Sequence, residues 1–367
     1  MPQSPAAAAG IILVIVPALA CGGSSVAAPS ARSQLTPVVS TAEWPASAPD
    51  SQGVNAQSIL DLVARVGRGE YGSVSSVLLV RHGQLIVEEY FGWSASRAHT
   101  VQSVTKSITS LLAGMAIDRG RLSIADRAVD SFPGYQPIAN LDERKRAVTV
   151  RDLLTMRTGL DWSEGSYAGS PLQQLNDCRC DWLRFVLDWP MREMPGTRWE
   201  YVSGGVILLG GIVGVASGQR IDLLAAEQLF APLGIENAWW YSGLPNGLPH
   251  SGGGLNLRPR DMAKLGQLVL DGGRWRGTQI VSEAWIREST QPGLANVRSF
   301  GAYAADYGYL WWTLPRGIIT ASGAQGQWIF VVPGMDLVVV VTGESDANFL
   351  SGPDLLYRQV LPAVNGV

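Results

Sequence analysis

Two groups of β-rich segments, one near each end of the chain, constrain the fold most. Residues 75–93 (SSVLLVRHGQLIVEEYFGW) hold two such runs joined at His82-Gly83, which predicts a hairpin. The C-terminal part again favours strands, at 307–314, 317–323, 325–333 and 335–343, with turn residues between three of them. Short turns join antiparallel neighbours, so we expect both ends to contribute to one antiparallel sheet.

Helical patterns surround and separate these strands. Residues 55–69 form an amphipathic pattern, with Ile59, Leu60, Val63 and Val66 along one side. The segment 206–216 (VILLGGIVGVA) is apolar on all sides but too short to span a membrane, which predicts a buried helix. A last helix is expected from about 348 to 364. The sequence thus predicts one composite α/β (α+β) domain over 51–367, with an α/β part at about 51–118 and 255–367 and a helical part at about 119–254.

The N-terminus reads as a targeting segment. Residues 6–20 form an apolar run that ends in small residues before Cys21, followed by a polar stretch. This resembles a bacterial lipoprotein signal over residues 1–21, with Cys21 as the lipidated residue and membrane anchor. An ordinary secretory signal cut near Ala20 is the alternative. Residues 22–50, rich in Ser, Ala and Pro, are expected to be a disordered tether, so the protein is expected in the periplasm or cell envelope, or secreted.

Composition and cysteine content exclude several classes of protein. The net charge of −3 argues against nucleic-acid binding, which requires a basic face. Cys178 and Cys180 stand in NDCRCDW with no His or acidic cluster at metal spacing, so a local disulfide or two free thiols is expected. No metal or other cofactor is predicted. The tandem pairs Trp239-Trp240 and Trp311-Trp312 are expected mainly in the core.

The strongest chemical signal lies in VQSVTKSITSLLAGMAI, residues 101–117. The chain has only three lysines against twenty-five arginines, yet Lys106 stands three residues after Ser103 at the start of an apolar helical pattern. Residues three apart share a helix face, so the amine can reach the hydroxyl. A neutral lysine can take the proton of a serine, whereas arginine stays charged. The alternative is a surface lysine that follows a capping serine.

Two later segments supply further candidate groups. Tyr201 and Ser203 stand just before the apolar helix at 206–216, where a tyrosine can relay a proton. In the glycine-rich turn ASGAQGQ, residues 321–327, the N–H of Ala324 is a candidate oxyanion donor together with that of Ser103. Taken singly, these are also consistent with a tyrosine at a helix start and an ordinary hairpin.

In this order, the three segments resemble the serine β-lactamase and penicillin-binding-protein superfamily. The resemblance covers about residues 52–365 and includes LLTMRTGL (153–160) and SGGGLNLRPRDMAKLGQLVLDGG (251–273). Within its class C-like branch, GLDWSEGSY (159–167) is most similar to 6-aminohexanoate-dimer hydrolases and related esterases.

The resemblance implies a β-lactamase/transpeptidase-like fold, in which a central antiparallel sheet is flanked by helices and carries a mostly helical insertion. It also implies an acyl-enzyme mechanism that cleaves an ester or amide bond of a small molecule. Ser103 would be the nucleophile, Lys106 the base and Tyr201 the proton shuttle, with the amides of Ser103 and Ala324 as the oxyanion hole. The residues expected to contact substrate are Ser203, Ser322, Gly323, Tyr167 and Trp328.

The sequence departs from the family pattern at two places. Ser203 stands where many members have Asn, and Ala321-Ser322-Gly323 replaces a Lys or His, then Thr or Ser, then Gly. A substrate carboxylate that loses such a cation loses about 1.5–3 kcal/mol. This favours esters or amides over β-lactams unless an arginine elsewhere supplies the charge.

Other functions remain as alternatives. A class C-type β-lactamase, a D-alanyl-D-alanine carboxypeptidase and a non-catalytic lipoprotein that binds penicillin or peptidoglycan would fit the same segments. An α/β-hydrolase requires G-x-S-x-G, and no serine stands in that frame.

Overall fold

The computed structural model describes residues 34–364, apart from 42–43, 244–245 and 346–349. Residues 32–367 group into one compact unit. The predicted signal and Cys21 lie outside the described residues, as do residues 22–33 and 42–43 of the predicted tether. The described part of the tether packs on the domain: Trp44 is 2% exposed and its ring lies 5.5 Å from that of Trp275, so the prediction of disorder was wrong there.

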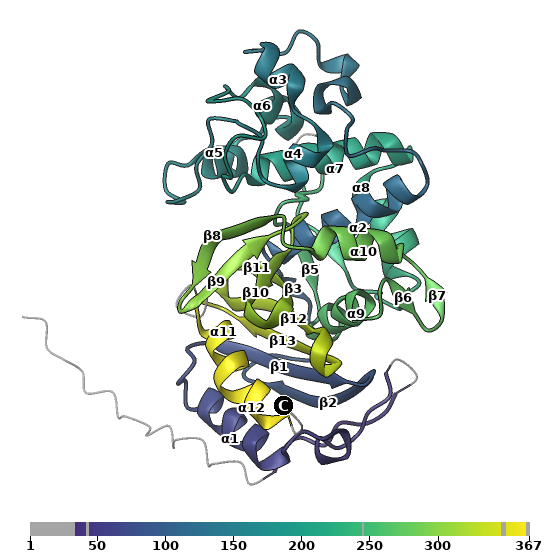
Figure 1. Cartoon of the computed structure of the whole chain (residues 1–367), viewed down its shortest axis with the longest axis vertical. Coiled ribbons are helices and arrows are strands. Elements are labelled where there is room, and N and C mark those ends of the chain that lie inside the picture. Colours follow the sequence, from purple (N-terminus) through teal and green to yellow (C-terminus); the bar gives the residue numbers. More distant parts are fainter. Residues whose placement is uncertain (1–33, 42–43, 244–245, 346–349, 365–367) are drawn as a thin grey trace, which may run out of the picture. The chain divides into compact units, whose positions relative to one another are not determined.

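An eight-stranded antiparallel sheet forms the centre of this unit, in the order β2-β1-β13-β12-β11-β10-β9-β8 (Figure 1). The two chain ends meet where β1 pairs with β13, for example at Leu79 and Val339. The prediction of one sheet built from both ends is confirmed. The strands are β1 Val74–Arg81, β2 Gln84–Tyr90, β8 Leu294–Phe300, β9 Tyr303–Tyr307, β10 Trp312–Leu314, β11 Ile318–Gly323, β12 Gln327–Val332 and β13 Leu337–Gly343.

Local sequence accounts for some of these strands better than for others. His82 and Gly83 both have positive φ, 50° and 71°, as the predicted tight hairpin between β1 and β2 requires. The edge strand β8 was not predicted, because most of its residues are exposed and it has no apolar run.

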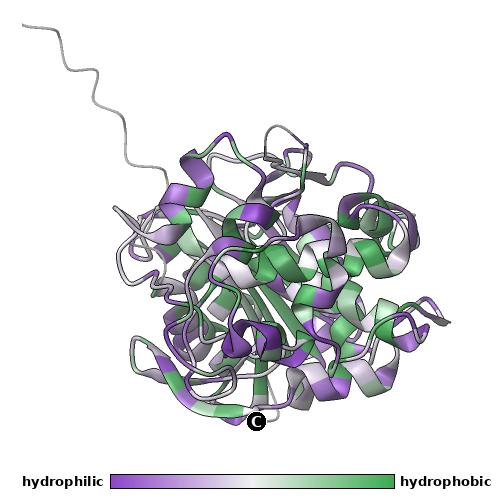
Figure 2. Ribbon diagram, turned by 90° about the horizontal axis from the view of Figure 1, so that it is seen from above, coloured by the Kyte–Doolittle hydropathy of each residue, from purple (hydrophilic) through white to green (hydrophobic). Residues whose placement is uncertain are grey.

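Helices cover both faces of the sheet. On one face α9 (Pro259–Leu270) brings Gly266 against Ile329 and Val338. On the other, α11 (Ser351–Leu355) brings Gly352 against Trp328, the neighbour of Ile329 on β12. Successive strand residues point to opposite faces, so α9 and α11 lie on opposite sides. In Figure 2 the hydrophobic residues gather on the central strands and on helices beside them.

Helices α2 (Val104–Asp118) and α10 (Glu283–Thr290) contact each other, and α2 also contacts β11 and β12. The predicted N-terminal helix is α1, Ala56–Gly67. Its buried side includes Leu62, whereas Leu60 is only half-buried, so the predicted stripe was wrong at that position. The C-terminal helix runs from α11 through the π-helical turn η9 (Leu356–Val360) to α12 (Leu361–Ala363).

Between residues 119 and 254 the structure is mainly helical. Helix α7 (Ser203–Ser217) is buried from Ser203 to Val213 and packs against α2, which confirms the predicted buried helix. The other helices here are α3 Glu143–Ala147, α4 Val150–Leu154, α5 Pro171–Asp177, α6 Trp182–Asp188, α8 Ile221–Ala225 and the π-helical turn η4 Ala226–Phe230. Cys178 and Cys180 are joined by a disulfide between α5 and α6. Of the two expected alternatives, a local disulfide or two free thiols, the structure contains the disulfide.

Two small sheets complete the fold. β3 (His99–Thr100), β5 (Leu255–Leu257) and β4 (Trp239–Trp240) form a three-stranded sheet, and β6 (Arg274–Trp275) pairs with β7 (Thr278–Gln279). β3 leads directly into the turn before α2. Within the described part of the chain, no single helix meets the length and hydropathy of a membrane span, although α7 and the segment Ile221–Phe230 pass together as a pair bent by 71°.

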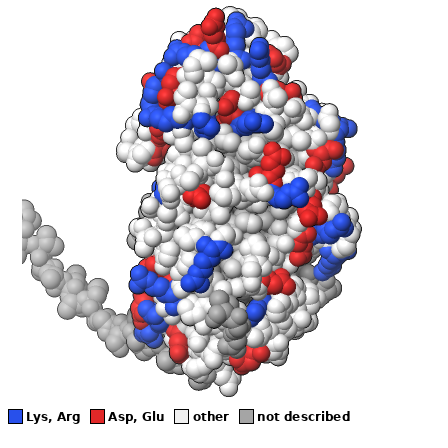
Figure 3. All heavy atoms as spheres, in the orientation of Figure 1, with Lys and Arg blue, Asp and Glu red and all other residues white. Residues whose placement is uncertain are grey.

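Charged side chains of both signs are interspersed over the face shown in Figure 3, and much of that face is uncharged. No extended basic surface is visible there, in keeping with the low net charge.

Candidate active site

Helix α2 places Ser103 and Lys106 together. Ser103 is the residue before the first turn of α2, where backbone N–H groups have no acceptor within the helix. Lys106 lies one turn further on and is buried, with 1% of its surface exposed. Its Nζ lies 3.0 Å from Ser103 Oγ and donates to the carbonyl oxygen of Gly252 across 2.6 Å. The lysine is therefore held between the serine and a backbone acceptor from a distant turn.

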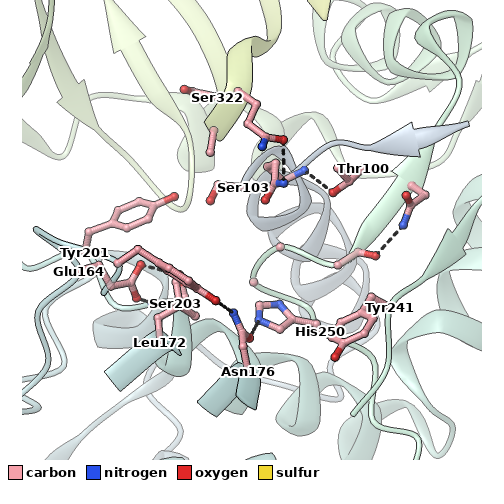
Figure 4. A pocket seen from close by; sticks show the side chains of 18 of the residues that line it. Thr100, Ser103, Glu164, Leu172, Asn176, Tyr201, Ser203, Tyr241, His250 and Ser322 are labelled. Atoms are coloured by element: carbon pink, nitrogen blue, oxygen red, sulfur yellow. Dashed lines mark hydrogen bonds between the residues drawn. The ribbon is translucent and has the colours of Figure 1, made fainter. Parts of the chain in front are cut away.

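Tyr201 lies against the same lysine. Lys106 Nζ is 4.6 Å from the centre of the tyrosine ring, and Trp312 stacks on that ring at 6.1 Å with an interplanar angle of 20°. The hydroxyl points toward the space beside Ser103 (Figure 4). Tyr201 thus stands beside the nucleophile and base predicted from sequence.

Ser203 occupies the first position of α7 and is held by Glu164. The two carboxylate oxygens accept from Ser203 N at 2.6 Å and from Ser203 Oγ at 2.9 Å. Trp162 Nε1 donates to the same carboxylate at 2.6 Å. A carboxylate at the start of a helix also complements the helix dipole. Glu164 therefore fixes the N-terminus of α7, which directly follows Tyr201.

Strand β11 and the turn after it border the site on another side. Ser322 and Ala324 line the cavity, while Ala321 is fully buried. A Cβ added at Gly323 would lie 2.4 Å from the carbonyl oxygen of Val101, so this position requires glycine. Gly323 was expected to contact substrate, but it is not among the residues that line the cavity. The strand contributes no positive charge at Ala321, as the sequence indicates.

These groups surround a cavity of about 830 Å³. It is lined by Ser103, Tyr201, Ser203, Ser322, Ala324 and Tyr167, all of which were predicted from sequence. Tyr167 lies on the loop before α5 and is 55% exposed. Of the described residues that line the cavity, Glu164, Asp177 and Arg298 have charged side chains. Among the described residues there is no cluster of His, Cys, Asp and Glu that could hold a metal ion.

The expectation that Trp328 contacts substrate requires correction. Its side chain is completely buried and does not line the cavity. It stacks on Phe330 at 5.2 Å and packs against Gly352 of α11, on the face of the sheet that α11 covers. Ser322, its partner in register on β11, does reach the cavity.

Several lining residues were not predicted. Trp239 was expected in the core, but it is 55% exposed and lines the cavity beside Tyr241, which is 50% exposed. Gly252 contributes through its backbone carbonyl, an atom that every residue type carries. The two adjacent tryptophans predicted aromatic packing, but they did not predict which ring would face the cavity.

His250 forms part of the cavity floor. Its Nε2 pairs with Asn176 Oδ1 at 3.1 Å, and Asn176 Nδ2 in turn donates to Tyr167 OH at 3.3 Å (Figure 4). Burial, together with the positive charge of Lys106, lowers the pKa of His250 from 6.5 to about 4. This histidine is neutral at pH 7 and connects the floor to the loop that carries Tyr167.

The sheet, the covering helices and this Ser-Lys-Tyr arrangement define a β-lactamase-like serine hydrolase fold. Residues 64–359 match the family model described as β-lactamase, and the chain belongs to that family.

Two curated relatives are similar over most of the chain. The 6-aminohexanoate-dimer hydrolase of Paenarthrobacter ureafaciens is 25% identical over 289 residues, covering 72% of this chain and 71% of its own length. Penicillin-binding protein 4 of Amycolatopsis lactamdurans is 26% identical over 302 residues, covering 72% and 76%. Among solved structures, EstCE1, described as a hydrolase with promiscuous acyltransferase activity, superposes with a TM-score of 0.69 at 17% identity. That superposition covers 82% of this chain and 99% of EstCE1 and concerns the fold alone.

Proposed function

We propose that this protein hydrolyses an ester or amide bond of a small molecule through an acyl-enzyme intermediate on Ser103. The observation that carries the proposal is the position of Lys106 Nζ, 3.0 Å from Ser103 Oγ and anchored on Gly252 O. Lys106 acts as the base after its ammonium, whose charge lowers the pKa of His250, has lost a proton. The neutral amine has two N–H bonds and one lone pair. With an N–H directed to Gly252, the lone pair is available to the serine proton.

In the first half-reaction, Ser103 Oγ attacks the substrate carbonyl carbon as Lys106 takes the hydroxyl proton. The backbone N–H groups of Ser103 and Ala324 would stabilise the negative oxygen of the tetrahedral intermediate. Its collapse breaks the bond to the leaving oxygen or nitrogen, and Tyr201 gives this atom its hydroxyl proton while the proton held by Lys106 restores the tyrosine hydroxyl. In the second half-reaction, water gives a proton to Lys106 or Tyr201 as it attacks the acyl-Ser103 ester, and this proton passes to Ser103 Oγ as the acid is released.

The test is p-nitrophenyl butyrate hydrolysis by the wild-type protein and a Ser103→Ala variant. We expect turnover by the wild type and a loss of at least about a hundredfold in the variant. A Ser107→Ala variant is the control, because Ser107 is buried on α2 and donates instead to Leu310 O. Equal turnover by Ser103→Ala would contradict the proposal. No turnover by any of the proteins, together with penicillin binding, would favour the non-catalytic alternative.

A β-lactamase or D-alanyl-D-alanine carboxypeptidase is the second candidate, and Arg298 on β8 is the observation that favours it. Arg298 is among the residues that line the cavity, and its guanidinium carbon lies 5.7 Å from the centre of the Phe300 ring, whereas the position occupied by a cation in many members of the family is the buried Ala321. An arginine can pair with a substrate carboxylate. Nitrocefin hydrolysis that falls at least about tenfold in Arg298→Ala, with ester hydrolysis unchanged, would support this candidate.

We also propose that the protein is exported and anchored through a lipid on Cys21. The support is the apolar run at residues 6–20 and the small residues before the cysteine. Metabolic labelling with a fatty-acid analogue should mark the wild-type protein but not Cys21→Ser. Labelling of both would contradict the anchor.

A further inference from the structure

We infer that one wall of the cavity is a binding site for the acyl group of the substrate, and that it selects medium-length acyl chains or aryl acyl groups. The acyl wall consists of Thr100, Asn256, Trp239 and Tyr241. All four residues line the same cavity as Ser103. The inference rests on the proposed function, because it requires Ser103 to carry an acyl group.

The three-stranded sheet builds this wall in register. Thr100 of β3 and Trp239 of β4 both pair with Asn256 of the central strand β5. Side chains of paired residues project from the same face of a sheet, so the three form a row across the strands. Tyr241 follows Trp239 by two residues and also reaches the cavity, whereas Trp240 does not line it.

The row starts beside the nucleophile and leads away from it. Thr100 stands three residues before Ser103, and Trp239 is two strands further across the sheet. Neighbouring strands are about 4.8 Å apart, so the backbones at Thr100 and Trp239 are separated by about 10 Å. With carbon–carbon bonds of about 1.5 Å, an extended acyl chain of roughly eight carbons covers this distance.

The acyl wall and the proton shuttle lie on opposite sides of Ser103. In Figure 4, Tyr201 and Glu164 are on one side, and Thr100 and Tyr241 on the other. Tyr201 must reach the leaving atom to protonate it, so the leaving group extends toward Tyr201. The acyl group is then directed along the opposite wall.

The far end of the wall is aromatic and exposed to the cavity. Trp239 and Tyr241 have 55% and 50% of their surfaces exposed, although both rings are large and mostly apolar. Tyr241 is supported from behind by Trp182, whose buried ring lies 5.9 Å away. Exposed aromatic rings that line a cavity beside reactive groups are typical of a ligand site. Among acyl groups, an apolar chain or an aryl ring gains the most binding free energy by covering these two rings.

The experiment compares p-nitrophenyl acetate, butyrate, hexanoate and octanoate in wild type, Trp239→Ala and Trp240→Ala. Each methylene that leaves water for an apolar surface gains about fourfold in kcat/KM. We expect the wild type to prefer octanoate to acetate by at least about tenfold. In Trp239→Ala this preference should fall by about tenfold. Trp240→Ala removes the same side chain from the opposite face of β4 and should keep the wild-type preference.

The ratio of two substrates in one preparation does not depend on how much of a variant is folded. A wild type without chain-length preference, or a Trp239→Ala variant with the wild-type ratio, would overturn the acyl wall. Either result leaves the proposed function intact provided that Ser103→Ala is inactive. Ester turnover by Ser103→Ala would instead contradict the proposed function itself.

Discussion

The carbonyl oxygen of Gly252 accepts a hydrogen bond from Lys106 Nζ across 2.6 Å, although the two residues are 146 positions apart in sequence. The same nitrogen is 3.0 Å from Ser103 Oγ. The turn at 250–254 therefore determines where the only lysine on α2 points, and several consequences can be measured.

Replacing Gly252 by Ala should change the position of the Lys106 amine relative to the Ser103 hydroxyl. An added Cβ would lie 3.0 Å from the carbonyl oxygen of Ser203, closer than ordinary van der Waals contact, so the turn or the backbone at Ser203 must move by a few tenths of an ångström. We expect ester turnover to fall by about tenfold or more, because a misplacement of about 1 Å in an active site can cost about a hundredfold. Gly253→Ala is the control, since its Cβ would meet His250 at an ordinary 3.5 Å. Equal activity of the two variants would contradict the role of the Gly252 carbonyl.

Replacing Lys106 by Met should abolish acylation. The side chain is 1% exposed, so a thioether of similar length removes the base and avoids the larger guanidinium of an arginine variant. We expect labelling of the protein by a fluorophosphonate probe to slow by about a hundred- to ten-thousandfold. Circular dichroism would check that the variant is folded. Labelling at the wild-type rate would show that Lys106 is not the base.

The free energy of unfolding should decrease in weak acid because of His250. Its pKa is about 4 in the folded protein and 6.5 in the unfolded chain, so between these values only the unfolded chain binds the proton. Stability is therefore lost as the pH falls from 6.5 to 4, by about 3 kcal/mol for this group. Urea unfolding at pH 7 and pH 4.5 should show a smaller pH dependence in His250→Gln than in wild type. The exposed His82, changed to Gln, should leave the wild-type dependence unaltered.

Glu164 should stabilise the N-terminus of α7. Its carboxylate accepts from Ser203 N, Ser203 Oγ and Trp162 Nε1, and Glu164→Gln would place an amide N–H₂ where one of these donors needs an acceptor. We expect a loss of about 1–3 kcal/mol in the free energy of unfolding. Glu70→Gln, at an exposed carboxylate paired with Arg65 and Arg68, should have a smaller effect. The opposite order of the two variants would contradict this role.

The three lysines show what composition can and cannot reveal. Lys106, Lys145 and Lys264 are all buried, with 1%, 3% and 0% of their surfaces exposed. Lys145 donates to the carbonyls of Ala139, Leu187 and Trp189, and Lys264 to that of Gly234. A compact ammonium with three donors suits such backbone acceptors. All three lysines of the chain are thus buried, and Lys106 is distinguished by its place beside the Ser103 hydroxyl and the Tyr201 ring.

Periodic patterns of apolar residues predicted the fold. They did not predict the shape of the site, because that shape depends on where individual side chains point. The hairpin at His82-Gly83, the buried helix at 206–216 and the strands 317–343 follow from local sequence. Trp239 was expected in the core. The side of β4 that faces the cavity depends on how three short strands pair, and the sequence does not show this pairing. Trp328 was expected to contact substrate, but its ring is completely buried and packs against Gly352 of α11.

Mass-spectrometric mapping of the fluorophosphonate adduct tests the central claim most directly. The protein would be labelled, digested and sequenced, with Ser103→Ala as the matched control. Our account predicts one adduct, on Ser103, and no labelling of the variant. An adduct on another residue, or equal labelling of Ser103→Ala, would contradict it.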